Sequence, residues 1–137
     1  MPRNFILFLL LGLAAISEAY ATCPCTGQTR LDSAGINGLL NGNTVCAILG
    51  NEKWQEYHSG GRVFELGNVS GGEDVGGWSV SANANGNNAT VTYDYGTGGS
   101  YTYSVCQASA GAPVDFCGTI RDVTNASVIS GKVGCGF

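Results

Sequence analysis

Apolar and polar residues alternate along three consecutive segments in the middle of the chain, at 78–82, 90–95 and 100–105. A period of two residues places alternate side chains on opposite faces, so each segment predicts a strand with one buried face. The Asn- and Gly-rich stretches between them predict tight turns, and therefore an antiparallel meander. The apolar faces of the second and third strands are Val91, Tyr93, Tyr95, Tyr101, Tyr103 and Val105.

Further apolar segments predict additional strands at 44–49, 53–58, 62–66, 116–123 and 126–133. The second and third of these form a hairpin that turns at 59–61, with Val63 and Glu65 on one face and Arg62 and Phe64 on the other. Residues 31–40 predict one or two helical turns, weakened by two glycines. The total is about seven or eight strands with little helix.

We therefore predict an all-β fold, a small disulfide-stabilised antiparallel β-barrel or β-sandwich with a short N-terminal helical turn. Unpaired strand edges invite aggregation, and closure into a barrel or folding into two sheets removes or shortens them. Consecutive hairpins favour an up-and-down barrel over a Greek-key sandwich. Residues 22–137 are expected to form this single β domain.

Residues 1–21 are predicted to be a cleaved signal peptide, which makes the protein secreted or periplasmic. The apolar run at 5–16 follows Arg3 and is about 18 Å long as a helix, too short to cross a bilayer of about 30 Å. Ala19 and Ala21 supply the small residues that precede a cleavage site. Lipid attachment at Cys23 is the less favoured alternative, and no later segment predicts a membrane-spanning helix.

Composition narrows the class of protein. The net charge is −4, and the six Lys and Arg residues are scattered singly, so a nucleic-acid partner is not expected. The 22 glycines follow no three-residue period, which excludes collagen. The supply of Val, Ile, Leu, Tyr and Trp disfavours disorder. Asn68, Asn88 and Asn125 begin glycosylation sequons, which matter only in a eukaryotic source.

The even number of cysteines, all downstream of the export signal, predicts disulfides. Cys23 and Cys25 are separated by one residue, so each is expected to pair with a different distant cysteine. Fifteen connectivities are possible for six cysteines. Binding of a soft metal by the Cys-Pro-Cys pair is the alternative, but no metal or cofactor is predicted. The six are Cys23, Cys25, Cys46, Cys106, Cys117 and Cys135.

Glu56, His58 and Arg62 are the candidates for catalysis. Glu56 and the single histidine, His58, are two residues apart, so on a strand their side chains share a face with Trp54. With Arg62 across the turn, they suggest the acid–base set of a small secreted hydrolase or nuclease. A solvated histidine in a polar hairpin is the simpler interpretation.

Aromatic residues are the candidates for ligand binding. Tyrosines two residues apart on neighbouring strands place their rings side by side. This face predicts a small-ligand pocket if it points into a barrel, a sugar-stacking platform if it lies on a surface, or a plain tyrosine-rich core. The candidate residues are Trp54, Tyr57, Trp78, Tyr93, Tyr95, Tyr101 and Tyr103.

The segments 42–45, 54–58, 60–61, 75–80 and 93–96 together resemble small exported bacterial proteins with a calycin-like layout, the β-barrel type of lipocalins and avidins. The resemblance covers about residues 42–105. It implies a barrel shape and assigns no binding residues.

The expected function is that of an exported, non-enzymatic binding module for a small molecule, a glycan or a protein surface. The alternatives are the small hydrolase or nuclease, and an extracellular structural or inhibitory protein that acts through an exposed edge strand or loop.

Overall fold

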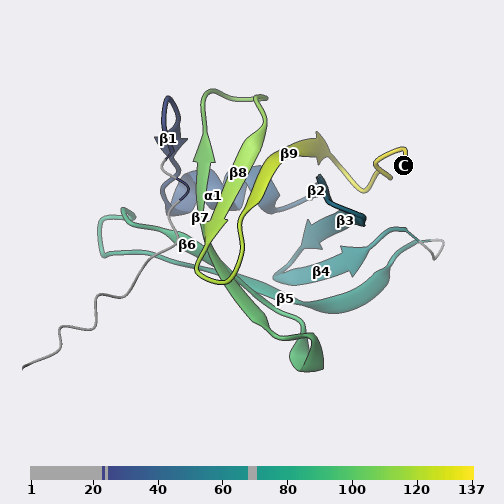
Figure 1. Cartoon of the computed structure of the whole chain (residues 1–137). Helices are drawn as coiled ribbons and strands as arrows, with labels where there is room; N and C mark the ends of the chain where they lie inside the picture. The colour runs from purple at the N-terminus through teal and green to yellow at the C-terminus, as the bar shows by residue number, and fades with distance from the viewer. Residues whose placement is uncertain (1–22, 24, 68–70) are drawn as a thin grey trace, which may run out of the picture.

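The computed structural model describes residues 23, 25–67 and 71–137. The predicted signal peptide and the sequon at Asn68 lie outside these residues. Nine strands and two short helices account for most of these described residues (Figure 1). The helices are α1 (Ser33–Leu40) and the 3-10 turn η1 (Gly96–Gly98). The strands are β1 (Thr29–Arg30), β2 (Asn43–Leu49), β3 (Glu52–Ser59), β4 (Arg62–Glu65), β5 (Glu73–Ser81), β6 (Thr90–Asp94), β7 (Ser100–Gln107), β8 (Val114–Gly118) and β9 (Val123–Ser130).

Strands β2 to β9 form a closed antiparallel barrel of eight strands. Each strand pairs with the next along the chain, and the ring closes because β9 also pairs with β2, where Val45 lies opposite Val128. The barrel is therefore of the up-and-down type, as the consecutive hairpins predicted. Strand β1 is a short addition that pairs with the end of β7. The barrel confirms the predicted all-β class and excludes the sandwich.

The alternating apolar faces point into the barrel. Val91 and Tyr93 pair in register with Tyr103 and Tyr101, and Val80 lies opposite Val91 on the other side of β6. The opposite faces of the same strands point outward, where the Thr92 and Thr102 hydroxyls are 2.7 Å apart. An eight-stranded barrel is just wide enough for side chains to fill its interior. Tyr93 and Tyr103 are buried there, so the tyrosine face lies inside the barrel.

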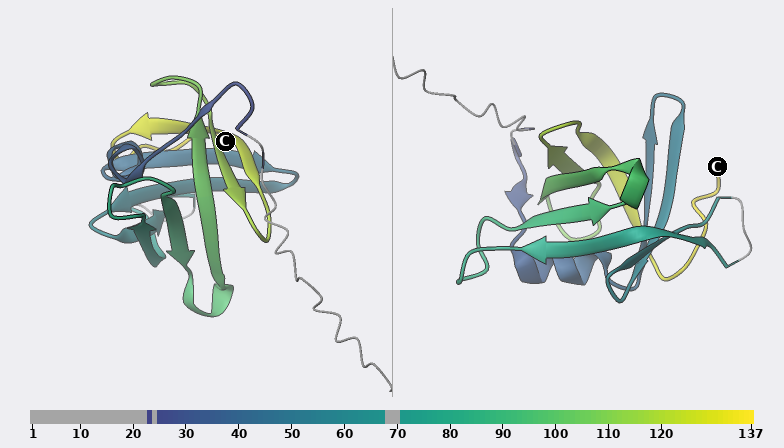
Figure 2. Two further views of the ribbon diagram at one scale, coloured as in Figure 1. Left: turned by 90° about the vertical axis from the view of Figure 1, so that its left-hand side faces the viewer. Right: turned by 90° about the horizontal axis from the view of Figure 1, so that it is seen from below.

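Helix α1 closes one end of the barrel. It contacts β2, β5 and β6, and because β2 and β6 lie on opposite sides of the ring, the helix must cross the barrel end. Ile36 and Leu40 are fully buried in the core. Figure 2 shows α1 packed against the barrel in both turned views. Among the described residues, no helix is long and apolar enough to cross a membrane.

Asp32 begins α1 by accepting a hydrogen bond of 2.7 Å from the backbone N–H of Gly35. Asp32→Ala leaves that N–H without its cap and should lower the free energy of unfolding by about 1 kcal/mol. Asp32→Asn keeps an accepting oxygen and should lower the free energy of unfolding by only a few tenths of about 1 kcal/mol. Chemical denaturation followed by tryptophan fluorescence measures both; equal losses would show that the cap does not stabilise the helix.

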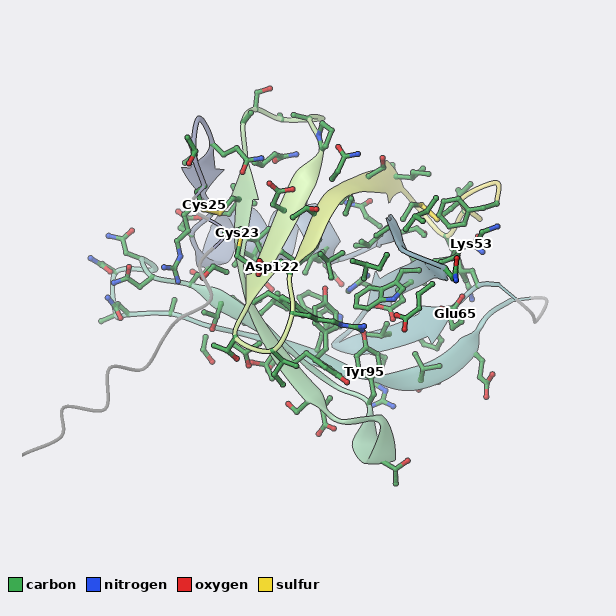
Figure 3. All side chains as sticks on the ribbon, viewed as in Figure 1. Cys23, Cys25, Lys53, Glu65, Tyr95 and Asp122 are labelled. Atoms are coloured by element: carbon green, nitrogen blue, oxygen red, sulfur yellow. A yellow bond between two sulfur atoms is a disulfide. The ribbon has the colours of Figure 1, made fainter. Side chains whose placement is uncertain are left out.

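Three disulfides link the described chain: Cys23–Cys117, Cys25–Cys106 and Cys46–Cys135. As predicted, Cys23 and Cys25 have different partners, and these lie on the neighbouring strands β8 and β7. The third bridge ties the C-terminal tail to β2. Figure 3 shows Cys23 and Cys25 on the opposite side of the molecule from Lys53 and Glu65. Three bridges indicate an oxidising extracellular or periplasmic environment.

The predicted strand 116–123 is wrong in its second half. Strand β8 ends at Gly118, and residues 119–122 form a loop before β9. A side chain at Gly118 would collide with the backbone of Arg121 and the ring of Tyr103, and the Gly118 N–H donates to the Asp122 carboxylate at 2.9 Å. The apolar residues Phe116, Ile120 and Val123 led the predicted strand to be extended across a polar turn.

Two other strand boundaries also differ from the prediction. Strand β9 is shifted toward the N-terminus and ends at Ser130, because Gly131 takes a positive φ of 83° and turns the chain back. Strand β5 starts at Glu73, five residues before the predicted start, and runs through the Gly76-Gly77 pair. Gly76 belongs to the strand because it pairs with Val63 on β4. A glycine is needed at this position because backbone atoms at the end of β6 lie too close for a side chain.

Candidate functional site

The barrel end opposite α1 carries the most unusual polar chemistry of the interior. We call it the Arg121 mouth and define it by Glu52, Trp54, Glu56, Tyr95, Tyr101, Tyr103 and Arg121. Arg121 belongs to the loop 119–122 between β8 and β9, and the other residues come from β3, from β7 and from the end of β6. These chain segments reach the same end because neighbouring strands run antiparallel around the closed ring.

The Arg121 guanidinium lies across this mouth. It is 4.6 Å from the centre of the Trp54 ring and 5.2 Å from the centre of the Tyr101 ring. Both distances lie within the range of cation–π attraction. Strands β3 and β7 face each other across the barrel, so the cation bridges opposite walls. Its Nη1 also pairs with a Glu52 carboxylate oxygen at 3.1 Å.

Glu56 is a buried carboxyl group below the guanidinium. The residue is 8% exposed, and the Tyr95 hydroxyl lies 2.9 Å from each carboxylate oxygen and donates to them. Burial raises the pKa of Glu56 to about 7, and the charge of Glu65, its register partner on β4, adds to this rise. The Tyr95 hydrogen bond and Arg121 oppose it. Glu56 therefore changes charge near neutral pH.

His58 lies deeper in the barrel and is fully buried. Its Nδ1 is 3.0 Å from the Glu56 carbonyl oxygen, which only accepts, so Nδ1 carries a proton. Its Nε2, 3.0 Å from the Tyr93 hydroxyl, is then the acceptor of that hydroxyl. Burial lowers the pKa of His58 to about 4, which keeps the ring neutral. Both ring nitrogens are engaged in structural hydrogen bonds.

Tyr103 brings an unsatisfied hydroxyl to the interior beside Glu56. The residue is 2% exposed, and its hydroxyl has no hydrogen-bond partner among the described residues. Burial raises the pKa of Tyr103, while the nearby Arg121 lowers it. The cavity here has a volume of about 10 Å³, room for about one water molecule. Its lining residues are Val45, Trp54, Glu56, Tyr93, Tyr103, Phe116 and Val123.

The structure divides the aromatic candidates into two groups. Six of the seven lie in the barrel core or pack directly against it. Among these six, Trp78 contacts His58, and their ring centres are 5.6 Å apart. Tyr57 instead packs outside the barrel against Phe64, with ring centres 6.2 Å apart and the Lys132 ammonium 5.6 Å from the centre of its ring. Tyr57 is thus separated from the other candidates by the barrel wall.

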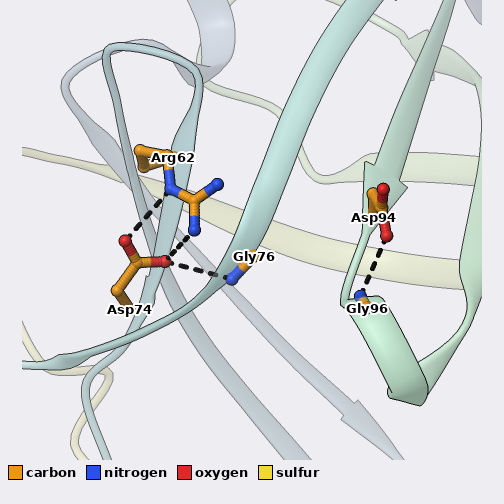
Figure 4. A network of polar contacts seen from close by, with 5 residues as sticks. All are labelled: Arg62, Asp74, Gly76, Asp94 and Gly96. Atoms are coloured by element: carbon orange, nitrogen blue, oxygen red, sulfur yellow. Dashed lines mark hydrogen bonds and ion pairs between the residues drawn. The ribbon is translucent and has the colours of Figure 1, made fainter.

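The catalytic candidates do not form one site. Glu56 and His58 share the inner face of β3, as the two-residue spacing predicted, but Arg62 points outward. Figure 4 shows its guanidinium bound to both carboxylate oxygens of Asp74, at 3.0 and 2.6 Å, while the Gly76 N–H donates to the same carboxylate. The acid–base set expected from the sequence therefore lacks its cation.

Arg121, Glu52 and Glu65 were not identified from the sequence as site residues. Arg121 is an isolated basic residue in a segment that the pattern assigned to a strand, so nothing local marked it. The only usable signal was Gly118 and Asp122 at the two ends of its loop, a composition typical of a turn. Glu65 was placed on the correct face of β4, but its proximity to Glu56 depends on the register between the strands.

The described residues contain one group of three potential metal ligands, the sulfurs of Cys25, Cys106 and Cys117, which lie within 4.8 Å of one another. All three sulfurs belong to disulfides. Thiolates are the metal-binding form of cysteine, so this group does not act as a metal site while the bridges are intact.

Comparisons of the chain with protein-family models, with curated proteins and with solved structures found no match.

Proposed function

We propose that the protein is an exported, non-enzymatic binding module that holds a small ligand at the Arg121 mouth. The observation that carries the proposal is the buried carboxyl group of Glu56 beneath aromatic rings at a barrel end. A buried ionisable group reduces stability, and strongly shifted carboxyl groups are concentrated at functional sites. Apart from His58, whose two ring nitrogens are both hydrogen-bonded, the core around this mouth is filled by apolar and aromatic packing.

Ligand binding at this mouth requires the loop 119–122 to move. The cavity of about 10 Å³ leaves no room beside the guanidinium. The Arg121 side chain, however, is 35% exposed and belongs to a loop and not to the barrel wall. If its side chain swings outward, the faces of Trp54 and Tyr101 and the carboxyl group of Glu56 become accessible to a ligand of similar size.

The buried histidine favours binding over catalysis. A general base needs a free nitrogen within reach of the substrate and a pKa near the working pH. His58 has both nitrogens occupied, is fully buried, and has a pKa of about 4. Glu56 has an appropriate pKa, but Arg62 lies outside the barrel and cannot assist it.

Native mass spectrometry of the protein purified from its own secretions tests the proposal. We expect a bound small molecule that is released by mild denaturation and rebinds on refolding. Tyr101→Ala removes one wall of the mouth and should weaken retention by about tenfold, since an aromatic contact contributes about 1 kcal/mol or more.

Tyr57→Ala is the matched control, because this tyrosine lies on the outer surface of the same barrel and should leave retention unchanged. The absence of any bound small molecule, or an equal loss in the two variants, would contradict the proposed function.

A further inference from the structure

We propose that the ligand of the Arg121 mouth is an organic cation, a primary ammonium or a guanidinium group, which takes the place of the Arg121 side chain. The inference rests on the proposed function and specifies its ligand class. In the closed structure the mouth already holds such a group, supplied by the chain itself, and the surroundings of that group define what can replace it.

Two aromatic faces form the first part of the cation site. The rings of Trp54 and Tyr101 lie on opposite walls, and the guanidinium lies 4.6 and 5.2 Å from their centres. Aromatic faces attract cations through their negative quadrupole, and the attraction is larger where water is excluded. Neutral polar ligands gain nothing comparable from this arrangement.

Acidic groups at the mouth outnumber its cation. Glu52 pairs directly with Arg121, whereas the described structure has no hydrogen bond or ion pair between Arg121 and Glu56. Glu65 lies beside Glu56 in register. The carboxyl group of Glu56 thus lacks a partner of opposite charge at contact distance. A free cation, not tethered to the loop, is able to reach it.

The Tyr103 hydroxyl adds a second polar group that the Arg121 side chain leaves unsatisfied. It is buried beside Glu56 and close to the Arg121 guanidinium, yet among the residues described neither this hydroxyl nor the buried Arg121 Nε has a hydrogen-bond partner. A buried polar group without a partner costs about 1–3 kcal/mol, and this cost is removed if a ligand N–H reaches it. An ammonium or guanidinium group supplies several N–H donors, enough for the Glu56 carboxylate and the Tyr103 oxygen together.

Arg121 then acts as an internal competitor. A ligand must displace its guanidinium from Trp54, Tyr101 and Glu52 before it binds, so removal of that guanidinium should raise the affinity for external cations. If the mouth instead binds neutral ligands, Arg121 serves only to cover and retain the ligand. Removal of its guanidinium should then lower the affinity.

Cation binding should also release a proton between about pH 6 and 7. Glu56 is partly protonated in that range and would ionise beside a cation. The other groups that influence its charge are Tyr93, Tyr95 and Tyr103, Glu65 on β4, and Arg121 in the loop. Affinity for a cation is therefore expected to rise from pH 6 to pH 8.

Butylguanidinium and its neutral isostere butylurea are suitable probes, measured by calorimetry with the exported protein and its disulfides intact. We expect butylguanidinium to bind and butylurea to bind at least about tenfold more weakly. Arg121→Gln should raise the butylguanidinium affinity about tenfold, and Glu56→Gln should lower it about thirtyfold. Calorimetry in buffers of different ionisation enthalpy measures the released proton.

Arg62→Gln and Glu73→Gln make the same charge changes on the outside of the barrel and should alter the affinity less than twofold. Equal binding of the two probes, or no gain on Arg121→Gln, would overturn the assignment to a cation. So would a failure of butylguanidinium to bind to both the wild-type protein and Arg121→Gln. A retained small molecule that depends on Tyr101 would in each of these cases leave the proposed function intact.

Discussion

Replacement of Glu56 by glutamine is expected to raise the free energy of unfolding by about 3 kcal/mol at pH 8 and to leave it nearly unchanged at pH 4. The pKa of Glu56 is about 7 in the folded protein, against a reference value of 4.5. One pKa unit corresponds to about 1.4 kcal/mol. Above pH 7 the folded protein must hold a buried charge that glutamine does not carry, while the amide oxygen still accepts from Tyr95.

The pH dependence of stability distinguishes Glu56 from His58. Between pH 4.5 and 7 the folded protein keeps a proton on Glu56 that the unfolded chain has lost, so this residue makes stability fall as pH rises. His58, with a folded pKa of about 4 against 6.5, has the opposite effect: its contribution is complete above pH 6.5 and is lost as pH falls toward 4. The two slopes offset each other between about pH 4.5 and 6.5.

Urea denaturation of the oxidised protein from pH 4 to pH 8 measures these slopes. The wild-type protein should show a weak dependence up to pH 6.5, and Glu56→Gln should show stability that rises steadily to that pH. Glu73→Gln removes an exposed carboxylate from β5 and should leave the wild-type profile unchanged. A parallel shift of the whole Glu56→Gln profile, without a change in its slope, would show that Glu56 is not titrating in the folded state.

Gly76→Ala is expected to lower the free energy of unfolding by about 3 kcal/mol, the upper part of the range for overpacked sites. The position of an added Cβ is already occupied by backbone atoms of Asp94, the last residue of β6, and of Tyr95, which follows it. Gly76 pairs with Val63 on β4 and is next to Gly77, whose pairing with Asp94 ends the β5–β6 ladder, so its backbone cannot move aside without disturbing both pairings. The displacement would also move Tyr95, whose hydroxyl holds Glu56.

Gly77→Ala provides the matched control one residue along the same strand. An added Cβ there would lie 3.4 Å from the Arg62 guanidinium and from the Gly61 carbonyl oxygen, an ordinary van der Waals distance. Its effect should be within about 0.5 kcal/mol of zero. Thermal and urea denaturation of both variants test the difference, and equal destabilisation would show that β5 and β6 are not so closely packed at Gly76.

Stabilisation by Glu56→Gln would have a functional meaning together with the binding data. Residues at binding sites are often retained at a cost to stability. A variant that is more stable at pH 8 and binds cations about thirtyfold more weakly would show that the buried carboxyl group serves the ligand and not the fold.

The sequence alone determined the class of fold and most of its strands, because period-two alternation depends only on neighbouring residues. It also placed Glu56 and His58 on one face, and it required Cys23 and Cys25 to have separate partners. It misplaced the ends of β8 and β9 because single apolar residues, Ile120 and Val133, continue the pattern beyond the strand ends, and it missed the first half of β5 because two glycines resemble a turn.

Only the tertiary structure decided which side of each strand is enclosed and which distant residues meet there. Closure of β9 onto β2 turned the tyrosine face into an interior, put Arg62 and Tyr57 outside, and brought Arg121 across the mouth between Trp54 and Tyr101. These contacts join residues far apart in sequence, so no local pattern encodes them. The pKa of Glu56 likewise depends on burial, which exists only once the ring is closed.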